Sequence, residues 1–208
     1  MLVWNEDTAS KWHKSFPQLV AQMLDHDQEE NMLGGCDENG NATMAEVDET
    51  KIGKRKHNKG KRASASWAIG VVERTRQRRT AWAVVQKRDA SACMAVIKRF
   101  MLPGLIVHSD EWGGCNPIKK MGVGCAHRRP CHKKESVNAT DRFRTHTQTI
   151  EGNDGAVKKA MPVHKRSNED LQDCLFEFMW QRNNAGDWWK ALLKGMSTVR
   201  HGAPVLHH

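Results

Sequence analysis

The sequence predicts an α/β protein in which strands come first along the chain and helices last. Between residues 44 and 110, short runs rich in β-branched and aromatic residues end at polar or glycine-containing segments, which is typical of strands. After residue 146, apolar residues recur at intervals of three and four, which is typical of helices. At 208 residues, the chain is long enough for one main domain with a small appendage.

The first 43 residues predict a short helical segment followed by a linker. The apolar residues with helical spacing are Trp12, Phe16, Leu19, Val20 and Met23. Residues 26–43 are polar and rich in Gly and Asn, which predicts a loop. We therefore expect three parts: a helical segment and linker over 1–43, the main domain over 44–200 and a tail over 201–208.

Four strands are expected in the main domain. Residues 44–52 form a run that contains an acidic cluster and leads into a basic segment. The runs at 66–74 and 80–87 flank a polar, arginine-rich turn and predict a hairpin. The run at 105–110 predicts a short buried strand that ends at a carboxylate, Asp110.

Helices are expected around and after these strands. Residues 91–101 predict a helix with Ser91 as its cap, ended by Pro103 and Gly104, and residues 112–121 also have a helical pattern. Residues 126–144 are basic and irregular. Further helices are expected over 146–162, from Ser167 to about 183, and over 187–196, with Trp180, Trp188 and Trp189 as packing residues of the last two.

Composition narrows the range of partners. Lys and Arg outnumber Asp and Glu by 33 to 24, and the formal charge of +9 favours a polyanionic partner. With neither a long apolar run nor a secretory leader, the chain is expected to be soluble, unsecreted and without a membrane partner. Its six cysteines form no CxxC pair, and the group from Cys125 to His132 fits no common zinc finger.

Three carboxylates stand at positions suited to a metal site. Asp48 lies in the first strand, Asp110 ends a buried strand and Glu151 opens a late helix. Rigid platforms of this kind can bring distant residues together. Carboxylate oxygens are ligands that Mg²⁺ prefers, and two such ions can promote phosphodiester cleavage. The alternative is that Asp48 and Glu49 belong to an ordinary solvated loop neutralised by neighbouring cations.

Four blocks of the sequence resemble a known family. VDETKIGKRKHNKGKR, IVHSDEW, HTQTIEG with Lys158 seven residues after Glu151, and LQDCLFEFMWQRNN are similar to DDE transposases of the Merlin superfamily and their bacterial insertion-sequence relatives. The resemblance runs from about residue 44 to about 195. It implies an RNase H-like fold, in which a mixed sheet flanked by helices holds two aspartates and one glutamate around Mg²⁺.

By this resemblance, Asp48, Asp110 and Glu151 are the catalytic residues and metal ligands, with Mn²⁺ able to replace Mg²⁺. His146 and Gln148 are supporting residues. The expected DNA-binding residues are Lys51, Lys54, Arg55, Lys56, Lys59, Lys61, Arg62 and Lys158. Glu49 faces away from Asp48 if the strand alternates, and is expected to be structural.

The resemblance further implies a DNA transposase that cleaves transposon ends and transfers the strands into target DNA. The implied partners are double-stranded DNA, both the transposon ends and the target, and at least one more copy of the chain. A eukaryotic host, with location in the nucleus, is favoured over a bacterial one, with location in the cytoplasm or nucleoid.

The chain also departs from the family. It contains no tyrosine, Asn153 and Asp154 stand where a tryptophan is expected, and residues 1–43 have no CxxC pair to build an end-recognising zinc ribbon. These departures favour one alternative, a catalytically inactive relic or domesticated DNA-binding protein. A second alternative is another RNase H-like nuclease that acts on RNA-containing duplexes.

Overall fold

The computed structural model describes residues 6–36, 40–52, 66–109, 126–128, 148–161 and 168–199. The helices are α1 (Glu6–His26), α2 (Gln28–Asn31), α3 (Ala90–Phe100), α4 (Gln148–Ala160), α5 (Asn168–Asn183) and α6 (Trp188–Thr198). The strands are β1 (Met44–Ile52), β2 (Ser66–Glu73), β3 (Thr80–Val85), β4 (Ile106–Ser109) and β5 (Ala126–Arg128). None of these helices is long and apolar enough to cross a membrane.

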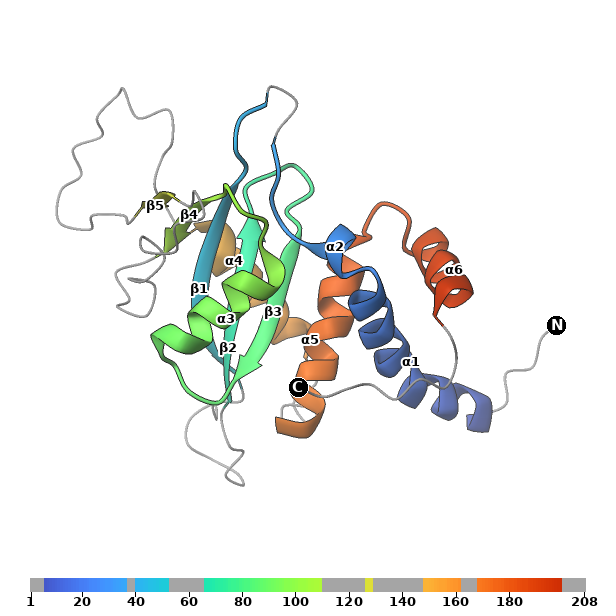
Figure 1. Ribbon diagram of the computed structural model, residues 1–208. Coiled ribbons are helices and arrows are strands. Elements are labelled where there is room, and N and C mark those ends of the chain that lie inside the picture. Colours follow the sequence, from blue (N-terminus) through green and yellow to red (C-terminus); the bar gives the residue numbers. More distant parts are fainter. Residues whose placement is uncertain are drawn as a thin grey trace.

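The described strands form one mixed sheet in the order β3-β2-β1-β4-β5. β1, β2 and β3 pair antiparallel, whereas β4 is parallel to β1 and β5 is parallel to β4. Figure 1 shows α3 in front of the sheet, α4 behind it, and α1, α5 and α6 grouped beyond the β3 edge. The predicted α/β class, with an RNase H-like mixed sheet flanked by helices, is confirmed.

Helix α5 covers the edge of the sheet at β3. Outward-facing N–H groups of this strand donate to α5 side chains: Thr80 to Asn183 Oδ1 at 2.8 Å and Val84 to Gln172 Oε1 at 2.8 Å. Asn183 returns a hydrogen bond from Nδ2 to the Thr80 carbonyl at 3.0 Å. An uncovered edge would present unpaired backbone groups that invite aggregation, so α5 both packs against the sheet and satisfies its edge.

The Trp82 ring on β3 requires a glycine at the facing position of β2. Gly70 on β2 lies between Asp48 on β1 and Trp82 on β3 in the strand register. A Cβ atom at Gly70 would lie 2.4 Å from Cη2 of Trp82, whose side chain is completely buried. The indole ring therefore occupies the space over Gly70, on the same face of the sheet as Asp48.

The N-terminal segment is part of the same core. Leu19, Val20 and Met23 of α1 are buried in one hydrophobic cluster with residues of the sheet. The polar stretch after α1, expected as a linker, contains α2 and the completely buried Leu33, whose backbone bonds to Phe100 and Leu102.

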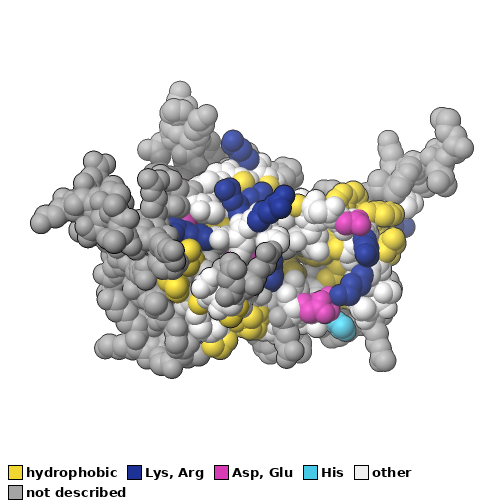
Figure 2. Space-filling view, turned by 90° about the horizontal axis from the view of Figure 1, so that it is seen from above, with side chains coloured by type: hydrophobic (Ala, Val, Ile, Leu, Met, Phe, Trp, Pro, Cys, Tyr) yellow, Lys and Arg dark blue, Asp and Glu magenta, His cyan; other side chains and the backbone are white. Residues whose placement is uncertain are grey.

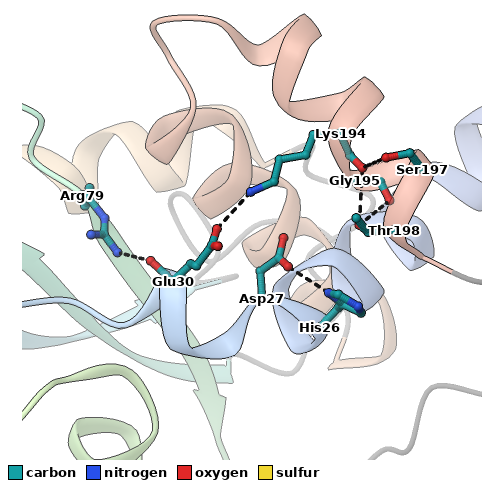
Figure 3. A network of polar contacts seen from close by, with 8 residues as sticks. All are labelled: His26, Asp27, Glu30, Arg79, Lys194, Gly195, Ser197 and Thr198. Atoms are coloured by element: carbon teal, nitrogen blue, oxygen red, sulfur yellow. Dashed lines mark hydrogen bonds and ion pairs between the residues drawn. The ribbon is translucent and has the colours of Figure 1, made fainter.

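Polar contacts hold α2 between the β2–β3 hairpin and α6 (Figure 3). Arg79 donates to the carbonyls of Glu30 and Met32 at 3.1 and 2.7 Å, and Lys194 of α6 pairs with the Glu30 carboxylate at 3.1 Å. His26 contacts Asp27 beside them at 2.8 Å. These surface contacts link the N-terminal segment to the hairpin and to the last helix.

Several local expectations were wrong. Asp89, not Ser91, caps α3, because its carboxylate accepts the Ala92 N–H at 2.9 Å. Residues 126–128, expected to be irregular, form β5. Trp180 is buried as predicted, but Trp188 and Trp189 are 54% and 57% exposed and do not act as packing residues. The helical pattern at 112–121 lies outside the described residues.

Candidate active site

One face of β1 carries three polar side chains, Glu46, Asp48 and Thr50. Successive residues of a strand point to opposite faces, so these alternate residues share one. Helix α4 packs on that face, because the Ile150 N–H in its first turn donates to Glu46 Oε2 at 2.8 Å. The helix that carries Glu151 is therefore joined directly to the strand that carries Asp48.

Asp48 lies in the middle of this face. Its side chain is half-buried, and its Oδ1 accepts the backbone N–H of Glu49 at 2.8 Å. On the β2 side, the register places Gly70 beside it, covered by the Trp82 ring. Asp48 therefore has a fixed backbone contact and a rigid apolar wall on one side.

Glu151 follows Ile150 in α4 and is exposed to solvent. Asp154 and Lys158 lie three and seven residues farther along, which places all three on one stripe of the helix. Asp154 interacts electrostatically with both Glu151 and Lys158, and its side chain hydrogen bonds to Thr50 of β1. A second link thus joins α4 to the face that carries Asp48.

The carboxyl group of Asp154 is partly buried. Burial raises the pKa of its carboxyl above the usual 3.8, and the nearby negative charge of Glu151 raises it further. The hydrogen bond from Thr50 and the positive charge of Lys158 act in the opposite direction but do not cancel the effect of burial. The side chain therefore holds its proton more strongly than an exposed aspartate does.

Glu49 belongs to the opposite face. Its side chain is 5% exposed and forms an ion pair with Arg88, which also stacks over the Trp67 ring at 5.0 Å. Lys51, on the same face, has its ammonium 5.5 Å from the Trp67 ring centroid. The expected structural role of Glu49 agrees with this ion pair, whereas Lys51 lies on the face away from Asp48.

Several predicted site residues cannot be placed. Asp110 lies outside the described residues, although Ser109, just before it, pairs with Val47, just before Asp48. Gln148 is the first residue of α4, and its side chain is outside the description. Also outside it are Lys54, Arg55, Lys56, Lys59, Lys61, Arg62 and His146.

The sequence reasoning missed Glu46 and the arginines of the β2–β3 turn. Glu46 is completely buried and pairs with Arg74. Its only signal in the sequence was its alternation with Asp48. Arg76 and Arg78 are exposed in the turn. Figure 2, which views the molecule from above relative to Figure 1, shows several Lys and Arg side chains gathered near the middle of this view.

The donor set suits a hard cation, since Asp48 and Glu151 offer carboxylate oxygens. Within the described ranges, no three His, Cys, Asp or Glu side chains are grouped closely enough to hold a metal ion. The third predicted ligand, Asp110, lies outside those ranges. The carboxylates fit Mg²⁺ in kind, and the described residues alone do not complete a site.

Comparison with known proteins gives two positive findings. The ISXO2-like transposase domain family matches residues 40–183. Among solved structures, a chain of the simian T-cell lymphotropic virus intasome, in complex with the PP2A regulatory subunit B56 gamma, aligns with a TM-score of 0.36 and 12% identity. That alignment covers 91% of this chain and 64% of the viral chain. No curated protein sequence matches.

Proposed function

Because the chain belongs to the ISXO2-like transposase domain family, we propose that it cleaves DNA at transposon ends and joins the freed ends to target DNA. The proposal names Asp48, Asp110 and Glu151 as the catalytic carboxylates. Its main support is the hydrogen bond from the Ile150 N–H to Glu46, which joins the start of α4 to the face of β1 that carries Asp48. Two of the three carboxylates thus come from directly linked elements.

The proposed site needs the Asp110 side chain to come within reach of Asp48. The parallel pairing of β4 with β1, in register up to Ser109 and Val47, supports this requirement. Carboxylates at the centre of a sheet and at the start of a packed helix are held on rigid elements. Such rigidity is what a metal site with few protein ligands requires.

In the proposed mechanism, Asp48, Asp110 and Glu151 hold divalent cations, Mg²⁺ or Mn²⁺. Bound there, divalent cations would supply activation of the attacking oxygen and stabilisation of the leaving one. The residues of the chain orient the scissile phosphate and the hydroxyl that attacks it. Trp82 and Gly70 form an apolar wall beside Asp48, which restricts water on that side.

DNA contacts come from basic side chains around the site. Lys158 shares the helix stripe of Glu151 and contacts phosphate beside it. Arg76 and Arg78 of the exposed β2–β3 turn add contacts near the start of β1. The basic segment after β1 supplies the remainder: Lys54, Arg55, Lys56, Lys59, Lys61 and Arg62. Lys51, within β1, lies on the face away from Asp48 and is not part of this set.

The test is nicking of labelled duplex DNA in Mg²⁺ or Mn²⁺, with Asp48→Asn beside the wild-type protein. Loss of metal-dependent nicking, with DNA binding retained, is expected for Asp48→Asn. Glu49→Gln is the matched control, because it removes a carboxylate of the same strand from the opposite face. Equal nicking by Asp48→Asn and wild type would exclude Asp48 from the site.

A second candidate function is DNA binding without catalysis, as in an inactive relic of a transposase. Asp154 favours it, since an additional carboxylate beside Thr50 and near Glu151 repels phosphate when ionised. This candidate predicts salt-sensitive DNA binding by the wild-type protein and no metal-dependent nicking. Restored nicking in Asp154→Trp, which introduces the residue the family resemblance leads us to expect, would identify Asp154 as the cause.

A further inference from the structure

Glu46 is a buried charge with two defined partners. The side chain is completely buried, and Arg74, itself 10% exposed, donates from Nε to Glu46 Oε1 at 2.5 Å. The other oxygen, Oε2, accepts the Ile150 N–H at 2.8 Å. Burying a carboxylate costs free energy unless it is paired and hydrogen bonded, so this arrangement is stable only while both contacts persist.

The contact with Ile150 involves the first turn of α4. The first N–H groups of a helix have no partner within the helix, and the positive end of its dipole favours a carboxylate there. Glu46 supplies that carboxylate from a strand 104 residues earlier in the chain. It therefore fixes where α4 begins on the sheet.

A second contact lies farther along the same pair of elements. Thr50 of β1 hydrogen bonds to Asp154 of α4. The two links therefore leave the strand on either side of Asp48 and reach the helix on either side of Glu151. Contacts at two points keep α4 from pivoting about either one, so they limit how far the start of Glu151's side chain can move relative to β1.

We propose that Glu46 is a positioning residue for Glu151, and that Arg74 holds Glu46 in place for this task. Both oxygens of Glu46 are engaged by protein groups, which distinguishes it from a metal ligand. The catalytic consequence rests on the proposed function, whereas the link between Glu46 and α4 does not. Glu46 acts on Glu151 through the backbone N–H of Ile150, the preceding residue of α4, and does not touch the reacting atoms.

The experiment combines amide hydrogen exchange of α4 with DNA nicking, measured on Glu46→Gln and Glu46→Asp. Glutamine keeps the size and loses the charge, and aspartate keeps the charge but is one methylene too short to reach both partners. Amides of the first turn of α4 should exchange at least about tenfold faster in both variants, because a hydrogen bond to a charged group is lost or weakened. Glu49→Gln should leave this exchange unchanged.

The same variants should nick DNA more slowly and need more Mg²⁺ for half-maximal rate, while their affinity for DNA stays within about twofold of wild type. A purely structural role would lower activity in proportion to the folded fraction and leave the Mg²⁺ dependence unchanged. Glu46→Asp guards against misfolding of Glu46→Gln, since it keeps a negative charge for Arg74.

Unchanged exchange at α4 in both variants would overturn the proposed link. Faster exchange with unchanged nicking and Mg²⁺ dependence would overturn the positioning role. Absence of nicking by the wild-type protein would overturn the proposed function and, with it, the catalytic consequence of Glu46. In that case the exchange data would still decide whether Glu46 holds α4.

Discussion

Gly70→Ala tests the packing that surrounds Asp48. The added methyl carbon would lie 2.4, 2.5 and 2.6 Å from three carbon atoms of the Trp82 ring. Contacts this short cannot persist, and the ring, which is completely buried, has no solvent into which it can turn. Either the indole or strand β2 must move.

Overpacking of a core typically costs about 1–3 kcal/mol. For a chain of this length each kcal/mol lowers the melting temperature by roughly 2–4 °C, so Gly70→Ala should melt about 2–12 °C below wild type. The control is Gly155→Ala in α4, where a Cβ atom would meet nothing within 4 Å. That change should stabilise the protein by about 0.5–1 kcal/mol, because glycine is unfavourable inside a helix.

The assay is thermal unfolding followed by circular dichroism, with both variants measured beside wild type. Trp82→Phe supplies a second check, since a smaller ring leaves room over Gly70. The double variant should lose less stability than the sum of the two single changes. A Gly70→Ala protein that melts with the wild type, or a double variant that is strictly additive, would refute this description of the packing.

Two other predictions follow from the described contacts. Asp154→Asn should stabilise the protein increasingly as pH rises toward neutrality. The pKa of the Asp154 carboxyl is raised in the fold, so its contribution is full below the unfolded value near 3.8 and is lost as pH rises through the folded pKa. A stability difference from wild type that is constant with pH in urea unfolding would contradict it. Asn183→Ala should cost about 1–3 kcal/mol, because the Thr80 N–H and carbonyl both lose their partner. Asn184→Ala, which loses one bond to the Trp180 carbonyl at the end of α5, should cost less in the same assay.

Periodicity in the sequence predicted most of the fold. Alternating or continuous apolar runs indicated β1, β2, β3 and β4 near their observed bounds, and helical spacing indicated α1, α3, α4, α5 and α6. These signals are local, because a strand or helix buries a face that recurs along the chain. The cap of α3 was misplaced by two residues, since Asp89 and Ser91 are both good capping residues.

What covers each surface could not be predicted from periodicity. The apolar spacing of α5 indicated a helix, but its polar residues Gln172 and Asn183 would ordinarily be assigned to solvent. Instead they satisfy the backbone of β3, 88 and 103 residues away in the chain. Likewise the amphipathic pattern of α6 did not show that Trp188 and Trp189 remain exposed. Such contacts depend on how distant elements meet, and the sequence of one element does not contain that information.

In the candidate site, too, local patterns were predicted from the sequence and contacts between distant elements were not. Strand alternation correctly separated Asp48 from Glu49, because that rule needs only the neighbouring residues. Glu46 was overlooked, although it shares the face of Asp48, since its importance depends on Arg74 and Ile150. The resemblance supplied Asp110 and Glu151, and only Glu151 falls within the described part of the chain.

The acidic segment of β1 presents less unpaired negative charge to the candidate site than its sequence suggests. Glu46 and Glu49 each have an arginine partner, Arg74 and Arg88, and Glu49 faces the opposite side of the sheet. Asp154 adds a carboxylate to the face of Asp48, but burial raises its pKa and so favours its neutral form relative to an exposed aspartate. In its protonated form this residue exerts no charge repulsion on phosphate. The departure from the family at Asp154 therefore weighs against catalysis through the ionised form of this residue, whose share falls as pH falls.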